Sequence, residues 1–151
     1  MLNNDFRDIL SEFCTAGVEF VLVGAYAMAA HGLPRATGDI DLWVRCTEEN
    51  ADRVMLALAR FGAPLHEIRA EDFHQPGIVF QIGVAPRRVD VLTEIDGVAF
   101  VEAWMDRTEV EIDGLTVPVL SRAHLLQNKR AAARPKDLAD VAWLEAERPD
   151  P

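Results

Sequence analysis

The chain has 151 residues, enough for one domain with a substantial buried core. Hydrophobic residues make up 50% of it and charged residues 26%, a composition typical of a folded protein and not of a disordered tail. The 25 acidic and 15 basic side chains give a net charge of −10. This charge disfavours sequence-independent binding along a DNA or RNA backbone, but it allows an enzyme that holds one nucleotide or one RNA end.

Neither a membrane protein nor a disulfide-rich secreted protein is expected. No apolar run approaches the roughly 20 residues that cross a bilayer, and the first ten residues contain an early acid and no signal-type apolar stretch. Cys14 and Cys46 are too few for a disulfide framework, so we expect a protein of the reducing cytoplasm.

Helical and strand patterns alternate through the first part of the chain. Apolar residues recur at helical spacing from residue 5 to residue 16, and the β-rich run that follows is typical of a short buried strand. In chain order the predicted elements are a helix at 5–16, a strand at 19–23, a helix at 24–31, a strand at 39–44 and a helix at 47–61.

A hairpin and two helices are predicted in the last part of the chain. Asp113-Gly114 marks the hairpin turn between strands at 108–112 and 115–119, because glycine readily takes a positive φ. Pro135 suits the first turn of a helix. The remaining segments are an irregular stretch at 63–77, strands at 78–82 and 89–92, a short helix or strand at 100–104, and helices at 121–133 and 135–147.

These patterns predict an α+β fold of mixed α/β character, because the chain shows no regular βαβ repeat. We expect a mixed sheet of four to six strands flanked by helices and followed by a C-terminal helical pair. One domain is expected over residues 1–151, with a core at about 1–119 and the C-terminal helices at about 121–147.

Asp39 and Asp41 form the most informative pair in the sequence. Residues i and i+2 of a strand point to the same face, so the two carboxylates project together while Ile40 and Leu42 point into the core. Two such carboxylates repel each other, which raises the pKa of one of them unless a cation lies between them. Cations that prefer oxygen ligands, Mg²⁺ above all, suit this pair.

A third acid, Asp90, lies between apolar residues of another predicted strand. If that strand neighbours the first, three carboxylates converge and can hold two metal ions about 4 Å apart, an arrangement suited to displacement at phosphorus. The alternative is a solvated acidic surface, the usual setting of such pairs. Other acid-x-acid pairs in the chain occur at Glu94/Asp96, Glu109/Glu111 and Glu145/Glu147.

Gly24 joins a predicted strand to a predicted helix. It would let a phosphate approach the backbone closely, and the first turn of the helix would offer free N–H groups to that phosphate. The alternative is an ordinary tight turn between the two elements.

Together these segments resemble the DNA-polymerase-beta-like nucleotidyltransferase superfamily. The chain more closely resembles small bacterial nucleotidyltransferase-like proteins of abortive-infection and toxin–antitoxin operons, roughly over residues 19–145. The matching segments are Val23-Gly24-Ala25, Pro34-Arg35-Ala36-Thr37-Gly38-Asp39-Ile40-Asp41, Val89-Asp90-Val91, Asn128-Lys129-Arg130 and Arg134-Pro135-Lys136-Asp137-Leu138-Ala139-Asp140.

The resemblance implies a role for each matched residue. The implied catalytic residues, which would also ligate two Mg²⁺ ions, are Asp39, Asp41 and Asp90. The implied nucleotide-binding residues are Gly24 and Ala25 along the triphosphate, Arg35 at a phosphate, Thr37 in the turn, and the two lysines of the chain, Lys129 and Lys136. Lys136 lies four positions before Asp140, so a solvated helix face is an alternative for the lysines.

The activity that the resemblance implies is Mg²⁺-dependent transfer of a nucleoside monophosphate from an NTP to a hydroxyl acceptor. The acceptor would be a tRNA end, a side chain of a protein partner encoded nearby, or a small molecule, and the system a toxin–antitoxin or abortive-infection pair. The alternative is a catalytically inactive relative that binds a protein partner or acts as a regulator. Ala25 favours this alternative, because the family has Gly or Ser there and a Ser hydroxyl could bind phosphate.

Overall fold

A mixed β-sheet forms the centre of the protein in the computed structural model, which describes residues 2–33, 38–84 and 87–146. The described elements are α1 (Asn4–Thr15), β1 (Phe20–Val23), α2 (Gly24–Ala30), β2 (Asp39–Val44), α3 (Glu48–Phe61), the 3₁₀ helix η1 (Ala70–His74), β3 (Val79–Ile82), β4 (Arg88–Leu92), α4 (Phe100–Met105), β5 (Thr108–Ile112), β6 (Leu115–Val119), α5 (Arg122–Ala132) and α6 (Pro135–Glu145).

The sheet has the order β3-β4-β2-β1-β6-β5 among the described strands. β2 pairs in parallel with β4, and β1 in parallel with β6, whereas the β1–β2, β3–β4 and β5–β6 pairs are antiparallel. The predicted α+β fold with a mixed sheet is therefore confirmed. The segment at 100–104, which fitted a helix or a strand, is helical as α4, and the irregular stretch at 63–77 contains η1.

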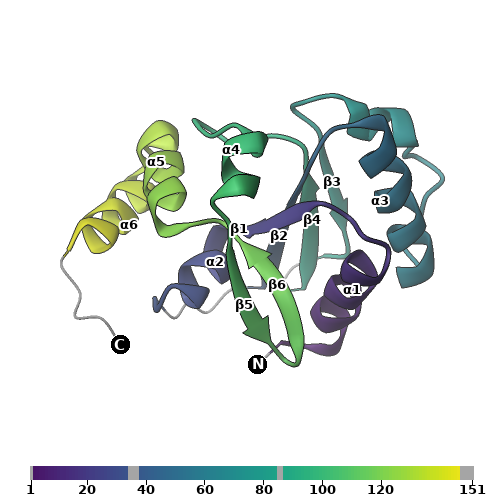
Figure 1. Ribbon diagram of the computed structural model, residues 1–151, viewed down its shortest axis with the longest axis horizontal. Coiled ribbons are helices and arrows are strands. Elements are labelled where there is room, and N and C mark those ends of the chain that lie inside the picture. Colours follow the sequence, from purple (N-terminus) through teal and green to yellow (C-terminus); the bar gives the residue numbers. More distant parts are fainter. Residues whose placement is uncertain (1, 34–37, 85–86, 147–151) are drawn as a thin grey trace.

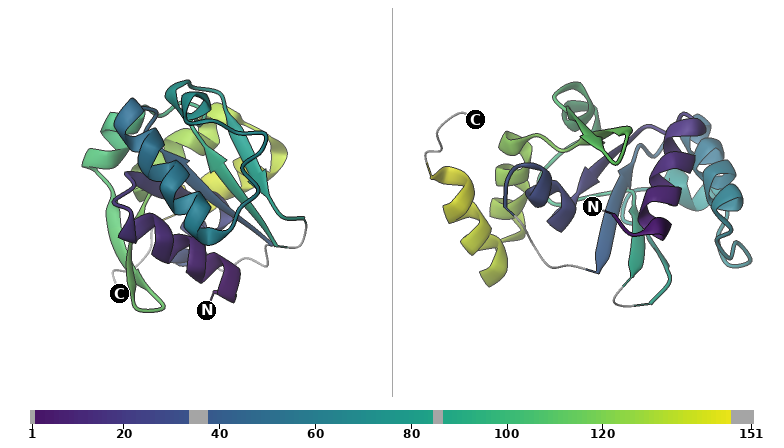
Figure 2. Two further views of the ribbon diagram at one scale, coloured as in Figure 1. Left: turned by 90° about the vertical axis from the view of Figure 1, so that its right-hand side faces the viewer. Right: turned by 90° about the horizontal axis from the view of Figure 1, so that it is seen from below.

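Helices lie on both sides of the sheet. α1 and α3 pack side by side on one side, whereas α5 and α6 lie together on the other (Figures 1 and 2). The apolar stripe of α1 predicted from its spacing is buried, since Phe6, Ile9, Leu10 and Phe13 are fully enclosed. β1 is wholly apolar and buried, whereas β2 and β4 combine buried apolar side chains with the polar residues Asp39, Asp41, Arg88 and Asp90, which are available to build a site.

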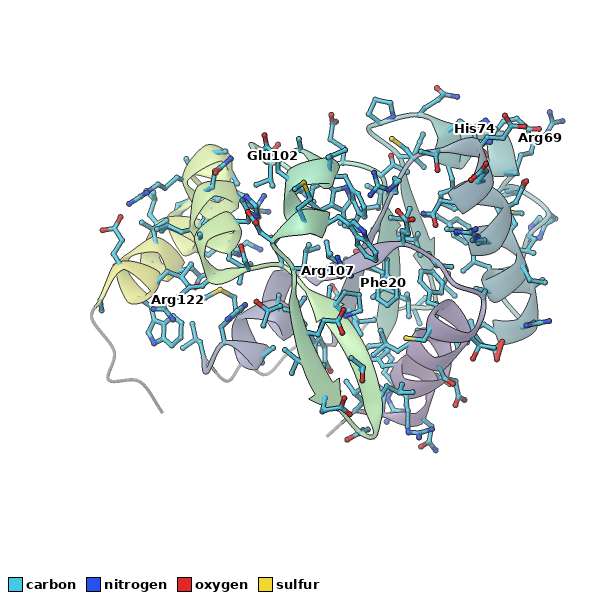
Figure 3. The ribbon with its side chains drawn as sticks, viewed as in Figure 1. Phe20, Arg69, His74, Glu102, Arg107 and Arg122 are labelled. Atoms are coloured by element: carbon cyan, nitrogen blue, oxygen red, sulfur yellow. The ribbon has the colours of Figure 1, made fainter. Side chains whose placement is uncertain are left out.

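The C-terminal helical pair is also confirmed. Ser121 caps α5 by accepting a hydrogen bond from the backbone N–H of His124, and Pro135 begins α6. Arg122 of α5, which is labelled in Figure 3, donates to the backbone oxygen of Leu144 in α6 at 2.9 Å. Within the described ranges, no helix is long and apolar enough to cross a membrane.

Candidate active site

The pairing of β2 with β4 brings the three predicted carboxylates together. In this parallel register Asp41 lies opposite Asp90, and Asp39 lies opposite Arg88. The three acids line one cavity of about 560 Å³. This cavity is also lined by four of the six residues predicted to bind a nucleotide, namely Gly24, Ala25, Lys129 and Lys136. The other two, Arg35 and Thr37, fall outside the described residues.

The carboxylates experience different electrostatic surroundings. The Arg88 guanidinium contacts Asp39 Oδ2 through Nη2 at 2.9 Å and Asp90 Oδ1 through Nε at 2.9 Å. The pKa of Asp41 is raised from 3.8 to about 7, chiefly by burial and then by the charge of Asp90, a hydrogen bond with Asp90 and the charge of Asp39, while the charge of Arg88 partly offsets them. Without a metal ion, Asp41 is therefore about half protonated at neutral pH, and its protonated form donates a hydrogen bond to Asp90.

Gly24, at the junction between β1 and α2, lies directly against the side chain of Asp41, a contact that the sequence did not predict. Its φ is +71°, a value that residues with a side chain rarely adopt. A Cβ at this position would overlap Oδ2 of Asp41, because Val23 pairs with Asp41 across β1 and β2. Gly24 thus makes the turn and also leaves the space that the Asp41 carboxylate fills.

The donor chemistry of the three acids fits Mg²⁺. All three supply carboxylate oxygens, and when all three are ionised their charge exceeds the single positive charge of Arg88, which contacts two of them. Nevertheless, within residues 2–33, 38–84 and 87–146 no three Asp, Glu, His or Cys side chains already surround a single metal position. The side chains of Asp39 and Asp90 are instead turned to Arg88.

Lys129 lines the cavity, but its ammonium group joins α5 to α6. Nζ lies 3.4 Å from Oδ1 of Asp137 and 3.2 Å from Oδ2 of Asp140, and all three residues are buried. Arg134 Nε contacts Oδ2 of Asp137 at 2.6 Å. Lys136 is exposed at the cavity wall, and the acid expected to lie near it at i+4, Asp140, contacts Lys129.

The charges around Asp137 have the opposite effect to those around Asp41. Burial alone would raise the pKa of Asp137, but hydrogen bonds from the side chain and backbone of Arg134, together with the charge of Lys129, outweigh it and lower that pKa. Asp137 is therefore firmly ionised at neutral pH and forms part of a balanced ion cluster.

The sequence reasoning missed Arg88, although a signal for it was present. Arg88 and Asp90 are two positions apart on β4, and the same spacing argument that paired Asp39 with Asp41 places both side chains on one face. Glu94 and Asp96 were expected on solvated surface. Both are exposed, and both also line the cavity.

Comparison with known families decides what kind of protein has this site. The family described as "Nucleotidyl transferase AbiEii toxin, Type IV TA system" matches residues 8–151. The chain belongs to the AbiEii nucleotidyltransferase family. It is therefore a nucleotidyltransferase enzyme, and the resemblance inferred from the sequence motifs is confirmed. A search of curated proteins finds no match to this AbiEii-family chain.

Solved structures share the fold of this AbiEii-family protein. A candidate nucleotidyltransferase of Thermotoga maritima superposes with a TM-score of 0.61 at 18% identity, over 92% of this chain and 87% of that one. The lincosamide antibiotic adenylyltransferase LnuA, bound to lincomycin, has a TM-score of 0.60 at 16% identity, over 97% and 98%. ANT(2")-Ia with adenylyl-2"-tobramycin has a TM-score of 0.60 at 19% identity, over 92% and 84%.

Proposed function

We propose that this enzyme moves a nucleoside monophosphate from an NTP to a hydroxyl acceptor and that Asp39, Asp41 and Asp90 hold the Mg²⁺ ions required. The observation that carries the proposal is the convergence of these carboxylates, from β2 and β4, beside Gly24 in one cavity. Membership of a nucleotidyltransferase family supports the reaction class.

Different residues of the chain would bind the metal ions, the triphosphate and the acceptor. When bound at these acids, Mg²⁺ would lower the pKa of an attacking hydroxyl and offset charge on the leaving pyrophosphate. Asp41 would give up its proton on cation binding, because a nearby positive charge lowers a carboxyl pKa. Asp90, which is buried at the cavity wall, would lie nearest the acceptor hydroxyl. Gly24 and Ala25 would line the triphosphate, and Lys136 and Arg35 would bind its oxygens.

The family supports a role as the toxin of a type IV toxin–antitoxin pair, with an antitoxin protein as partner and the cytoplasm as location. A tRNA end, a side chain of a protein partner or a small molecule would be the acceptor. The solved structures named for lincomycin and adenylyl-tobramycin have this fold, which is therefore compatible with small acceptors.

The direct test is transfer of label from each α-³²P NTP, with Mg²⁺, to tRNA, to the product of the neighbouring gene and to small hydroxyl compounds. We expect label on one acceptor class and none with Asp39→Asn. Glu102→Gln is the control, since Glu102 projects from α4 outside the cavity (Figure 3). Failure to transfer label to every acceptor, together with failure to bind any NTP, would contradict the proposal.

A further inference from the structure

Arg88 makes two ion pairs with residues that we propose as metal ligands. Its Nε lies 2.9 Å from Oδ1 of Asp90, and its Nη2 lies 2.9 Å from Oδ2 of Asp39 and 3.3 Å from Oδ2 of Asp90. One guanidinium thus bridges β2 and β4 and contacts three of the four carboxylate oxygens of these two acids. This forked contact is the geometry in which arginine binds carboxylates best.

We propose that Arg88 is an internal counter-cation that competes with the divalent metal for Asp39 and Asp90. In the metal-free protein its guanidinium offsets part of the charge of three clustered carboxylates and holds two of them in place. A divalent cation that binds these acids meets both a like charge and oxygens already engaged in hydrogen bonds, so Arg88 must withdraw from them. The proposal rests on the proposed function for the position of the metal.

The competition has a thermodynamic consequence that an ordinary structural ion pair lacks. Arg88 stabilises the metal-free state and is displaced when the metal binds. The cost of breaking its contacts therefore makes the free energy of metal binding less favourable. Removing its charge should therefore make the metal-free protein less stable and the metal-bound state easier to reach. A purely structural arginine would change stability and leave metal affinity as it was. Arg88 is in this sense a positioning residue of the acid cluster.

Arg88→Gln is the informative variant, since glutamine keeps an N–H donor and loses the charge. Arg45→Gln is the matched control. Arg45 is a partly exposed arginine whose side chain pairs with Glu19, with 24% of it exposed against 32% for Arg88, and it does not line the cavity. The measurement is Mn²⁺ affinity by titration calorimetry at pH 8 without nucleotide, together with thermal unfolding in EDTA.

We expect Arg88→Gln to bind Mn²⁺ about 10-fold more tightly than wild type and to unfold at a lower temperature in EDTA. Arg88→Lys, which keeps the charge but loses the fork, should show a smaller gain in affinity, and it carries the test if Arg88→Gln does not fold. Arg45→Gln should lower the unfolding temperature and leave the Mn²⁺ affinity unchanged.

Unchanged or weaker Mn²⁺ binding by Arg88→Gln and Arg88→Lys, with wild type binding normally, would overturn the role of Arg88 and leave the proposed function standing. If wild type does not bind Mn²⁺, or if Asp39→Asn binds it as tightly as wild type does, the metal site itself would be overturned and with it both proposals.

Discussion

Two ion clusters contribute to the same cavity and differ in their charge balance. Among the described residues, the carboxylate cluster contains Asp39, Asp41 and Asp90 against one cation, Arg88. The helix-pair cluster contains two acids and two cations, Asp137 and Asp140 with Lys129 and Arg134. In the first, burial together with the neighbouring acids raises the pKa of Asp41, whereas in the second the neighbouring cations outweigh burial and lower the pKa of Asp137.

This difference separates a cluster that joins secondary-structure elements from one suited to bind a cation. In a balanced cluster the buried charges are paired by other members, so removing one of the cations leaves a buried acid with less positive charge beside it. A cluster with excess negative charge keeps a demand for positive charge that a metal ion can meet.

The largest expected effect is on activity in the carboxylate cluster. Asp90→Asn keeps the shape of the side chain and removes a proposed metal ligand, so nucleotide transfer should fall by about 10³-fold, or about 4 kcal/mol of barrier. Initial rates of label transfer at saturating NTP measure this, with Glu102→Gln as the control. A fall of less than tenfold would show that the third carboxylate is dispensable.

Loss of a cation from the helix-pair cluster should reduce stability. Lys129→Met leaves Asp137 and Asp140 buried without the ammonium group between them, and the free energy of unfolding should fall by about 3 kcal/mol. Urea unfolding at pH 7 measures this loss. Adding Asp140→Asn to Lys129→Met should recover part of it, because one unpaired charge is then gone. If the two losses simply add, the residues do not act as one cluster.

Removing a charge from the carboxylate cluster should increase the stability of the protein, whereas removing one from the helix-pair cluster reduces it. Because the pKa of Asp41 is 3.8 ordinarily and about 7 in the folded protein, its ionisation costs stability progressively as pH rises between those values. Asp41→Asn should therefore stabilise the metal-free protein by about 2 kcal/mol at pH 8 and have little effect at pH 4. Denaturant unfolding in EDTA at the two pH values tests this, and destabilisation at pH 8 would contradict the charge argument.

The helix-pair cluster should show the reverse pH dependence. The folded-state pKa of Asp137 lies below its ordinary 3.8, so its ionised form contributes stability that is present above that value and lost as pH falls through the lowered pKa. Asp137→Asn should accordingly destabilise the protein more at pH 7 than at pH 3. A loss of equal size at both pH values would assign it to packing and not to charge.

The smallest expected effect is the difference in stability between alanine variants of two glycines that have nearly equal φ values. Gly24 has a φ of +71° and Gly17 a φ of +72°, but a Cβ at Gly17 meets open space, whereas one at Gly24 overlaps Asp41. Both alanine variants should lose about 1 kcal/mol from backbone strain, and Gly24→Ala should lose about 1 kcal/mol more. Thermal unfolding measures the difference, and equal losses would mean that the Asp41 side chain moves aside freely.

Much of the fold could be predicted because its signals are local. Helical spacing predicted α1, and Asp113-Gly114 predicted the hairpin turn between β5 and β6. Ser121 and Pro135 indicated where the two C-terminal helices begin. The segment of α4 was ambiguous, since six residues are too few for periodicity to distinguish a helix from a strand. The motif residues of the site were likewise visible, and Asp39, Asp41 and Asp90 do converge.

The sequence by itself determined which acids share a strand face and which family the chain resembles, because both depend on spacing between near neighbours. Only the tertiary structure decided that β2 pairs with β4. That pairing brings Arg88 to an acid 49 positions away, and the pairing of β1 with β2 brings Asp41 against Gly24. It likewise decided that Lys129 joins two helices. Burial and charge balance are properties of the packed protein, because they depend on every group that surrounds a side chain.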